Sequence, residues 1–270
     1  MQRVHFISGL PRAGSTVLAA ILRQNPRIYA AMSGPVAGLV SALQINASAG
    51  EFSVFLDNAR RTRILRSVFE SYYSDTAGIG LIFDTNRSWT ARVPLLSELF
   101  PDCKVICCVR DIGWIINSIE ALLRRNPLQL SRIFECKPMV SAYARAEYLM
   151  NPEKGLIGAA WSTLREAWFG EHAHRLIVIT YDQLVANPAQ TIEKLYTELR
   201  EPSFAHNFDD VEYDEQTYDS AVGSPGLPKV RRKVAPLWSQ PIIPPDLFAK
   251  YKDRSFWTDN NAIQSGVVVL

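Results

Sequence analysis

The chain has 270 residues, of which 47% are hydrophobic and 21% charged, which indicates a globular protein and excludes a disordered or fibrous one. The formal net charge of +2 excludes a general binder of nucleic acid, because any basic site must be local. The sequence shows neither the roughly 20 apolar residues that a membrane helix needs nor a signal-peptide layout. We therefore expect a cytoplasmic protein without a membrane partner, and its four cysteines fit reduced core thiols.

The first thirty residues predict a strand, a glycine loop and a helix. Residues 4–8 are apolar and β-prone, residues 9–16 are the loop, and residues 17–24 fit a helix. Loop N–H groups and the positive end of the helix dipole attract an anion. The two loop glycines have the five-residue spacing of a Walker phosphate loop, but Ser15 stands where that loop has lysine. We predict a site for a phosphate-like group whose cation is Arg12, rather than a site for ATP bound in the usual way. The alternative is that the glycines only permit a tight turn.

Strands alternate with helices along most of the chain. After a loop and helix within residues 30–49, we predict strands at 80–84, 104–109 and 175–181 and helices at 52–76, 90–100, 114–125, 141–148, 158–172 and 188–199. This alternation predicts an α/β fold in which helices flank a central parallel sheet, and we expect one domain over residues 1–270. Such sheets bind ligands beyond the carboxyl ends of their strands.

Two charged stretches are interpreted as surface features. In the helix over residues 52–76, the arginines are expected to form the solvated face; they are Arg60, Arg61, Arg63 and Arg66. Residues 205–240 contain an acidic run, a Gly/Pro-rich stretch and a basic run. We expect this segment to be a loop that folds over the crevice.

A second anion site is predicted after the central strand. Arg110 follows that strand and Ser118 stands eight residues later, about two turns into the next helix. A guanidinium and a hydroxyl so placed can bind an anion. The alternative is a salt-bridged arginine and a neutral helix serine. Together with the glycine loop, however, the pair defines two phosphate-sized sites for one nucleotide.

On these residues the chain resembles sulfotransferases that use 3′-phosphoadenosine 5′-phosphosulfate, and within them it is most similar to tyrosylprotein sulfotransferases and their bacterial relatives. The resemblance implies a P-loop-like sulfotransferase fold and spans roughly residues 4 to 235. It implies that the 5′-phosphosulfate is bound by Pro11, Arg12, Ala13, Gly14, Ser15 and Thr16. It further implies that Arg110 and Ser118 bind the 3′-phosphate, that Tyr181 contacts the nucleotide, and that Lys229 belongs to a loop closing over it.

The acceptor side departs from the family pattern. The stretch that carries a catalytic glutamate in tyrosylprotein sulfotransferases, here residues 30–35, has no acid, and Thr85 stands at the catalytic lysine position. We predict Arg12 as a catalytic cation at the leaving phosphate, Arg87 as the replacement for the lysine, and Asp84 as the general base. A helix or turn cap is the alternative for Asp84. No metal is required, because arginines supply the positive charge.

The acceptor is expected to carry a hydroxyl, with a peptide tyrosine, a small phenol, a glycan and a lipid all open. Two other functions remain open as well. One is a nucleotide-dependent kinase or other phosphotransferase with a degenerate loop, and the other is a non-catalytic nucleotide-binding module. The sequence does not fix the oligomeric state, and a homodimer is one of the options.

Overall fold

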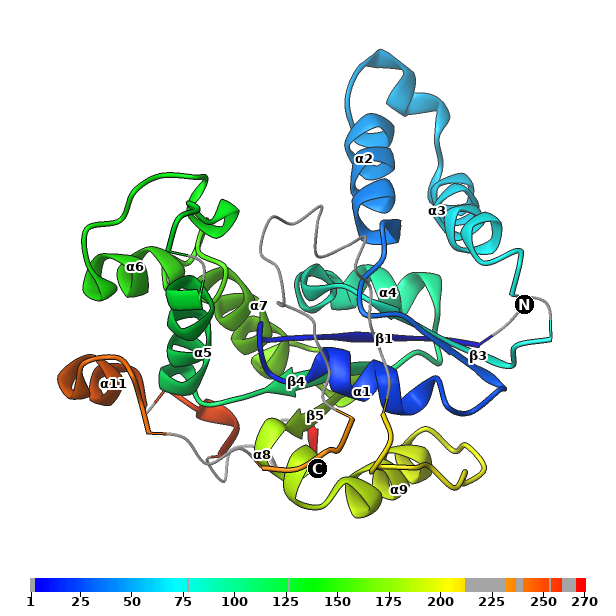
Figure 1. The fold of residues 1–270 in the computed structure, drawn as a ribbon. Helices are drawn as coiled ribbons and strands as arrows, with labels where there is room; N and C mark the ends of the chain where they lie inside the picture. Colours follow the sequence, from blue (N-terminus) through cyan, green and yellow to red (C-terminus); the bar gives the residue numbers. More distant parts are fainter. Residues whose placement is uncertain are drawn as a thin grey trace.

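A central sheet of parallel strands organises the fold (Figure 1), in a computed structural model that describes residues 3–76, 78–125, 127–211, 232–236, 240–252, 254–258 and 266–270. Within these residues the sheet has six strands in the order β2–β3–β1–β4–β5–β6, and every neighbouring pair is parallel. The strands are β1 (Arg3–Gly9), β2 (Ile28–Ala30), β3 (Leu81–Thr85), β4 (Val105–Val109), β5 (Leu176–Thr180) and β6 (Val268–Val269). β3 and β4 are buried throughout, as expected where helices cover both faces of a parallel sheet. The predicted α/β fold is confirmed.

Helices lie on both sides of this sheet. In Figure 1, α3 (Asn58–Tyr72) and α4 (Val93–Leu99) are above it, and α1 (Ser15–Leu22), α8 (Tyr181–Ala186) and α9 (Pro188–Glu198) are below. The helices α5 (Ile112–Arg125), α6 (Ala142–Leu149) and α11 (Pro245–Lys252) gather at one end. The other helices are α2 (Val36–Ser48) and α7 (Gly158–Phe169), and 3₁₀ turns cover Glu51–Phe55, Arg87–Arg92, Arg132–Phe134, Ala173–Arg175 and Phe256–Thr258. No helix in the described ranges is both long enough and apolar enough to span a membrane.

An aromatic cluster marks the face of the sheet that α3 covers. Phe6 of β1 packs edge-on against Trp89 and Phe69, with ring centroids 5.0 and 5.9 Å away. Phe6 is in register with Asp84 of β3, and side chains in register on neighbouring strands point to the same face. Asp84 therefore points to the α3 side. The next residue, Thr85, points to the opposite side, where α1 lies.

The predicted helix over residues 52–76 is interrupted, because α3 begins only after Asp57, whose side chain caps it by accepting a hydrogen bond from Arg60 N. Arg61 donates hydrogen bonds to three backbone carbonyls between residues 47 and 56. The expectation that Arg61 belongs to the solvated face is therefore wrong. Its guanidinium instead closes the connection between α2 and α3, where the turning backbone leaves carbonyls without helix partners.

The segment 205–240 lies partly outside the described residues. Its described ends pair with each other: Val211 N donates to Arg232 O at 2.6 Å, and Val234 N donates to Phe208 O at 2.9 Å. The residues between, 212–231, include Lys229 and lie outside the described residues. The roles predicted for Lys229 and for this segment stay predictions.

Candidate functional site

The loop between β1 and α1 has a backbone that only certain residues adopt without strain. Gly9 has a φ of 101°, and a Cβ at this position would lie 2.2 Å from the carbonyl oxygen of Cys108, so only glycine fits against β4. Gly14, with a φ of 97°, caps α1. Arg12 also lies in the left-handed region, with a φ of 58°.

This loop presents N–H groups at the start of a helix. Leu18 N is the first amide to bond within α1, to Gly14 O at 2.9 Å, so the amides of residues 15–17 have no partner in the helix. These amides and the helix dipole favour an anion at this position. Of the predicted loop residues, Pro11 and Ala13 are buried, and Ser15 and Thr16 are partly exposed.

The two predicted anion motifs are in direct contact. The Nε of Arg12 donates to the Oγ of Ser118 at 3.2 Å. Burial lowers the pKa of Arg12, and the nearby charge of Arg110 lowers that pKa further. The structure therefore brings the end of β1 and the helix after β4 into one site, as the strand order β1–β4 requires.

Arg110 is stacked on Tyr181. Its guanidinium carbon lies 4.1 Å from the centre of the Tyr181 ring, which is cation–π geometry. Burial lowers the pKa of Arg110, and its buried Nε has no hydrogen-bond partner among the described residues. A buried donor of this kind is costly unless a ligand satisfies it. Two partly desolvated arginines that repel each other fit a multiply charged anion held between them.

The carboxyl end of β3 forms the other side of the site. Gly34 N donates to Thr85 O at 3.1 Å, which ties the loop before α2 to the strand end. Ser8 Oγ donates to Arg87 O at 3.0 Å, which joins the turn after β3 to β1. The side chain of Arg87 is exposed at this edge. Arg87 thus lies one strand away from the loop that carries Arg12.

Asp84 is held away from solvent. It is 1% exposed, its Oδ2 accepts from Tyr73 OH at 2.6 Å, and its Oδ1 accepts from Trp89 Nε1 at 2.7 Å. Burial raises its pKa. This geometry does not favour a general base, and that role stays a prediction. The alternative of a helix or turn cap is wrong, because the side chain that caps the 3₁₀ turn Arg87–Arg92 is Asn86, which accepts from Ser88 N at 3.0 Å.

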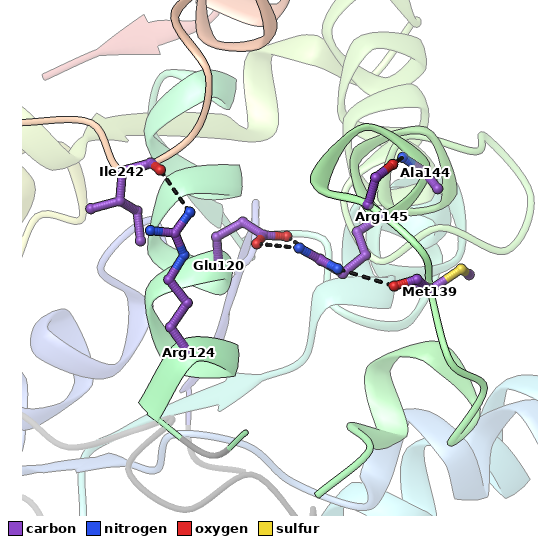
Figure 2. A network of polar contacts seen from close by, with 7 residues as sticks. Glu120, Arg124, Met139, Ala144, Arg145 and Ile242 are labelled. Atoms are coloured by element: carbon purple, nitrogen blue, oxygen red, sulfur yellow. Dashed lines mark hydrogen bonds and ion pairs between the residues drawn. The ribbon is translucent and has the colours of Figure 1, made fainter. Parts of the chain in front are cut away.

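Ser118 is positioned by a helix that is fixed on two further sides (Figure 2). Glu120 accepts a bidentate ion pair from Arg145 of α6, at 2.6 and 2.8 Å. Arg124 donates to Ile242 O at 2.8 Å, so α5 also holds the chain that leads into α11. The ion pair of Glu120 with Arg145 was not predicted from the sequence. The signal was a glutamate within the apolar residues of the predicted helix 114–125.

The fold and the site together define an α/β protein with a P-loop-like anion site. The chain belongs to the sulfotransferase family, which it matches over residues 5–205. It is 26% identical over 216 residues to nodulation protein NoeE of Sinorhizobium fredii (strain NBRC 101917 / NGR234), which is 72% of this chain and 49% of that protein. The chain therefore spans about half the length of this curated relative.

Solved sulfotransferase domains share the fold. The domain of the Synechococcus PCC 7002 olefin synthase superposes with a TM-score of 0.52 at 17% identity, over 98% of this chain and 94% of that one. A domain from the curacin biosynthetic pathway gives 0.53 at 16% identity, over 98% and 96%. The expected family and fold are confirmed. The finer similarity to tyrosylprotein sulfotransferases stays a prediction.

Proposed function

We propose that the chain is an enzyme that transfers the sulfuryl group of 3′-phosphoadenosine 5′-phosphosulfate to an acceptor hydroxyl. One observation carries the proposal: two half-buried arginines, Arg12 and Arg110, lie with an N–H-lined loop at the carboxyl edge of the sheet, and burial lowers the pKa of both. Family membership supports sulfuryl transfer over the kinase and over the non-catalytic module. We further propose that residues 1–270 act as one cytoplasmic domain that requires no metal.

The residues divide into two ends of one nucleotide site. The amides of residues 15–17 and the Thr16 hydroxyl bind the 5′-phosphate, and Arg110 and Ser118 bind the 3′-phosphate. The Tyr181 ring holds the Arg110 guanidinium in place by stacking. Arg12 reaches from the loop to Ser118, so it lies between the two phosphates.

The reaction forms a bond from the acceptor oxygen to sulfur and breaks the bond from sulfur to the 5′-phosphate oxygen. The electron pair of that bond leaves with the phosphate, and the acceptor proton passes to a base or to water. Like phosphoryl transfer, this reaction has a loose transition state, so the work of the protein is positioning and charge stabilisation. Arg12 and the loop amides stabilise the leaving phosphate, and Arg87 extends from the end of β3 toward the transferred group.

The acceptor is a hydroxyl compound, for which a peptide tyrosine, a small phenol and a glycan are the candidates. Incubation with a radiolabelled sulfate donor and a panel of these acceptors tests transfer directly. Label on any acceptor supports the proposal. Label on none, with adenosine 3′,5′-bisphosphate still bound, favours the binding module.

Calorimetry with adenosine 3′,5′-bisphosphate tests the site. Arg12→Ala and Arg110→Ala each remove charged hydrogen bonds worth about 1.5–3 kcal/mol, so affinity should fall roughly 10- to 150-fold. The control is Arg63→Ala, which removes an exposed arginine of α3 and should leave affinity unchanged. Unchanged affinity in both site variants would refute the assignments. Thermal stabilisation by ATP–magnesium but not by the bisphosphate would favour the kinase.

A further inference from the structure

Thr85 carries a hydroxyl that forms no hydrogen bond with any residue the structure describes. The residue ends β3 and is 6% exposed, and its Oγ1 is buried with no hydrogen-bond partner among the described residues. A buried hydroxyl without a partner lowers the stability of a fold. Valine has the same shape without this cost and an equal preference for strands. Stability alone therefore does not explain a threonine here.

Other buried threonines of the chain do have partners. Thr90 Oγ1 lies 3.0 Å from Thr163 Oγ1, and Thr191 Oγ1 donates to Asn187 O at 2.9 Å. These residues are 2% and 4% exposed, so they are buried at least as deeply as Thr85. Burial of a threonine in this fold therefore does not by itself leave its hydroxyl without a partner, and the case of Thr85 needs its own explanation.

The position of Thr85 points to the anion loop. β3 is the neighbour of β1, and Thr85 is in register with Ile7, two residues before the loop begins at Gly9. Asp84 points to the α3 side, so Thr85 points to the side of α1, whose first turn carries the amides without a partner in the helix. Its hydroxyl therefore faces the side on which the anion binds.

The strand order determines which end of the donor lies nearest. β1 stands between β3 and β4, so Thr85 lies on one side of the loop, and Arg110 and Ser118 lie on the other. If the 3′-phosphate binds on the β4 side, the opposite end of the donor, which carries the sulfuryl group, falls on the β3 side.

We propose that the Thr85 hydroxyl donates a hydrogen bond to an oxygen of the sulfuryl group during transfer. This inference rests on the proposed function. In the loose transition state the charge is spread over the sulfuryl oxygens, so a hydrogen bond to one of them orients the group and stabilises that charge, and its main effect is on rate. The same hydroxyl destabilises the protein without the donor, which is typical of functional groups placed for a ligand.

The test compares Thr85→Val with Thr85→Ser and with Thr191→Val as a matched buried control. Sulfuryl release from the donor, to a phenol or to water, should slow about 10- to 100-fold in Thr85→Val, and Thr85→Ser should stay within a few-fold of wild type. Affinity for adenosine 3′,5′-bisphosphate, which lacks the sulfuryl group, should not change in either variant. The Tm of Thr85→Val should equal or exceed that of wild type, and the Tm of Thr191→Val should fall.

Wild-type release in Thr85→Val would overturn the inference, and so would an equal loss of bisphosphate affinity, which would place the hydroxyl at the nucleotide instead. Should Thr85→Val not fold, a slow Thr85→Ala with normal bisphosphate affinity supports the inference, and a fast one refutes it. A wild-type protein that binds no bisphosphate would instead refute the proposed function.

Discussion

Replacing Arg145 by methionine removes the partner of a carboxylate that is buried between α5 and α6. Glu120 is 0% exposed, and Arg145 contacts its two oxygens at 2.6 and 2.8 Å. Hydrogen bonding to Glu120 favours the charged guanidinium and raises the pKa of Arg145. Arg145 also donates to Met139 O at 3.2 Å (Figure 2). The substitution therefore leaves a buried charge and a carbonyl without this partner.

The magnitude follows from burial. Breaking one side of a buried ion pair costs about 3–5 kcal/mol, which is a large part of the roughly 5–15 kcal/mol stability of a domain. At about 2–4 °C per kcal/mol, Tm should fall by roughly 6–20 °C. Removing both charges, as Glu120→Leu with Arg145→Met, eliminates the desolvated carboxylate. This double variant should lie within about 1 kcal/mol of wild type or be more stable.

Urea unfolding followed by circular dichroism measures these differences. Lys137→Ala is the control, because it breaks the ion pair with Glu135, whose side chain is 56% exposed against 65% for Lys137. A surface pair contributes at most about 1 kcal/mol. The reasoning would be refuted if Arg145→Met lost no more stability than Lys137→Ala, or if the double variant were as unstable as the single one.

Two further predictions concern buried titratable groups. His5 accepts a hydrogen bond from Lys104 N at 3.0 Å, and burial is the main cause that lowers its pKa from 6.5 to about 4. The unfolded chain therefore binds more protons between these values, so stability should fall by about 3 kcal/mol as pH drops from 6.5 to 4. Urea midpoints across this range should show a smaller decrease for His5→Asn, and an identical decrease would contradict the argument. Asp84→Asn places an amide where both oxygens accept from Tyr73 and Trp89, and it should cost about 1–3 kcal/mol. If Asp84→Asn instead keeps full stability and loses sulfuryl transfer, the result would support Asp84 as the general base.

The sequence predicted the elements in which local pattern and tertiary environment agree. The apolar run over residues 104–109 is observed as β4 (Val105–Val109), and the helix predicted at 188–199 is observed as α9 (Pro188–Glu198). A parallel strand buried on both faces is apolar throughout, and a proline in the first turn suits a helix start. These signals come from a few adjacent residues, so they can be recognised in the sequence without knowledge of the fold.

Elements that depend on distant partners were missed. β6 (Val268–Val269) is too short to show a period and exists because it pairs with β5, whose Val178 O accepts from Leu270 N at 2.8 Å. One boundary was also wrong for a local reason: Tyr181 was expected to end a strand but begins α8, because the Thr180 side chain caps the helix by accepting from Gln183 N.

In the candidate site, too, features set by local sequence were predicted and features set by distant contacts were not. The spacing of Arg110 and Ser118 was visible in the sequence, because a strand and the helix after it are contiguous. The hydrogen bond from Arg12 to Ser118 spans 106 positions and depends on β1 lying beside β4. The enclosure of Asp84 by Tyr73 and Trp89 likewise follows from packing. Sequence pattern therefore indicated the contacts within one strand–helix unit better than those between distant strands.

The bond between Arg12 and Ser118 also makes the two halves of the site a single thermodynamic unit. Altering either side chain changes the surroundings of the other, so the affinity losses of Arg12→Ala and Ser118→Ala should not add, and a double-mutant cycle gives the size of their coupling. The contact already spans the distance between the loop and α5. Arg12 and Ser118 therefore position each other before a ligand binds, so the two ends of the site are energetically coupled.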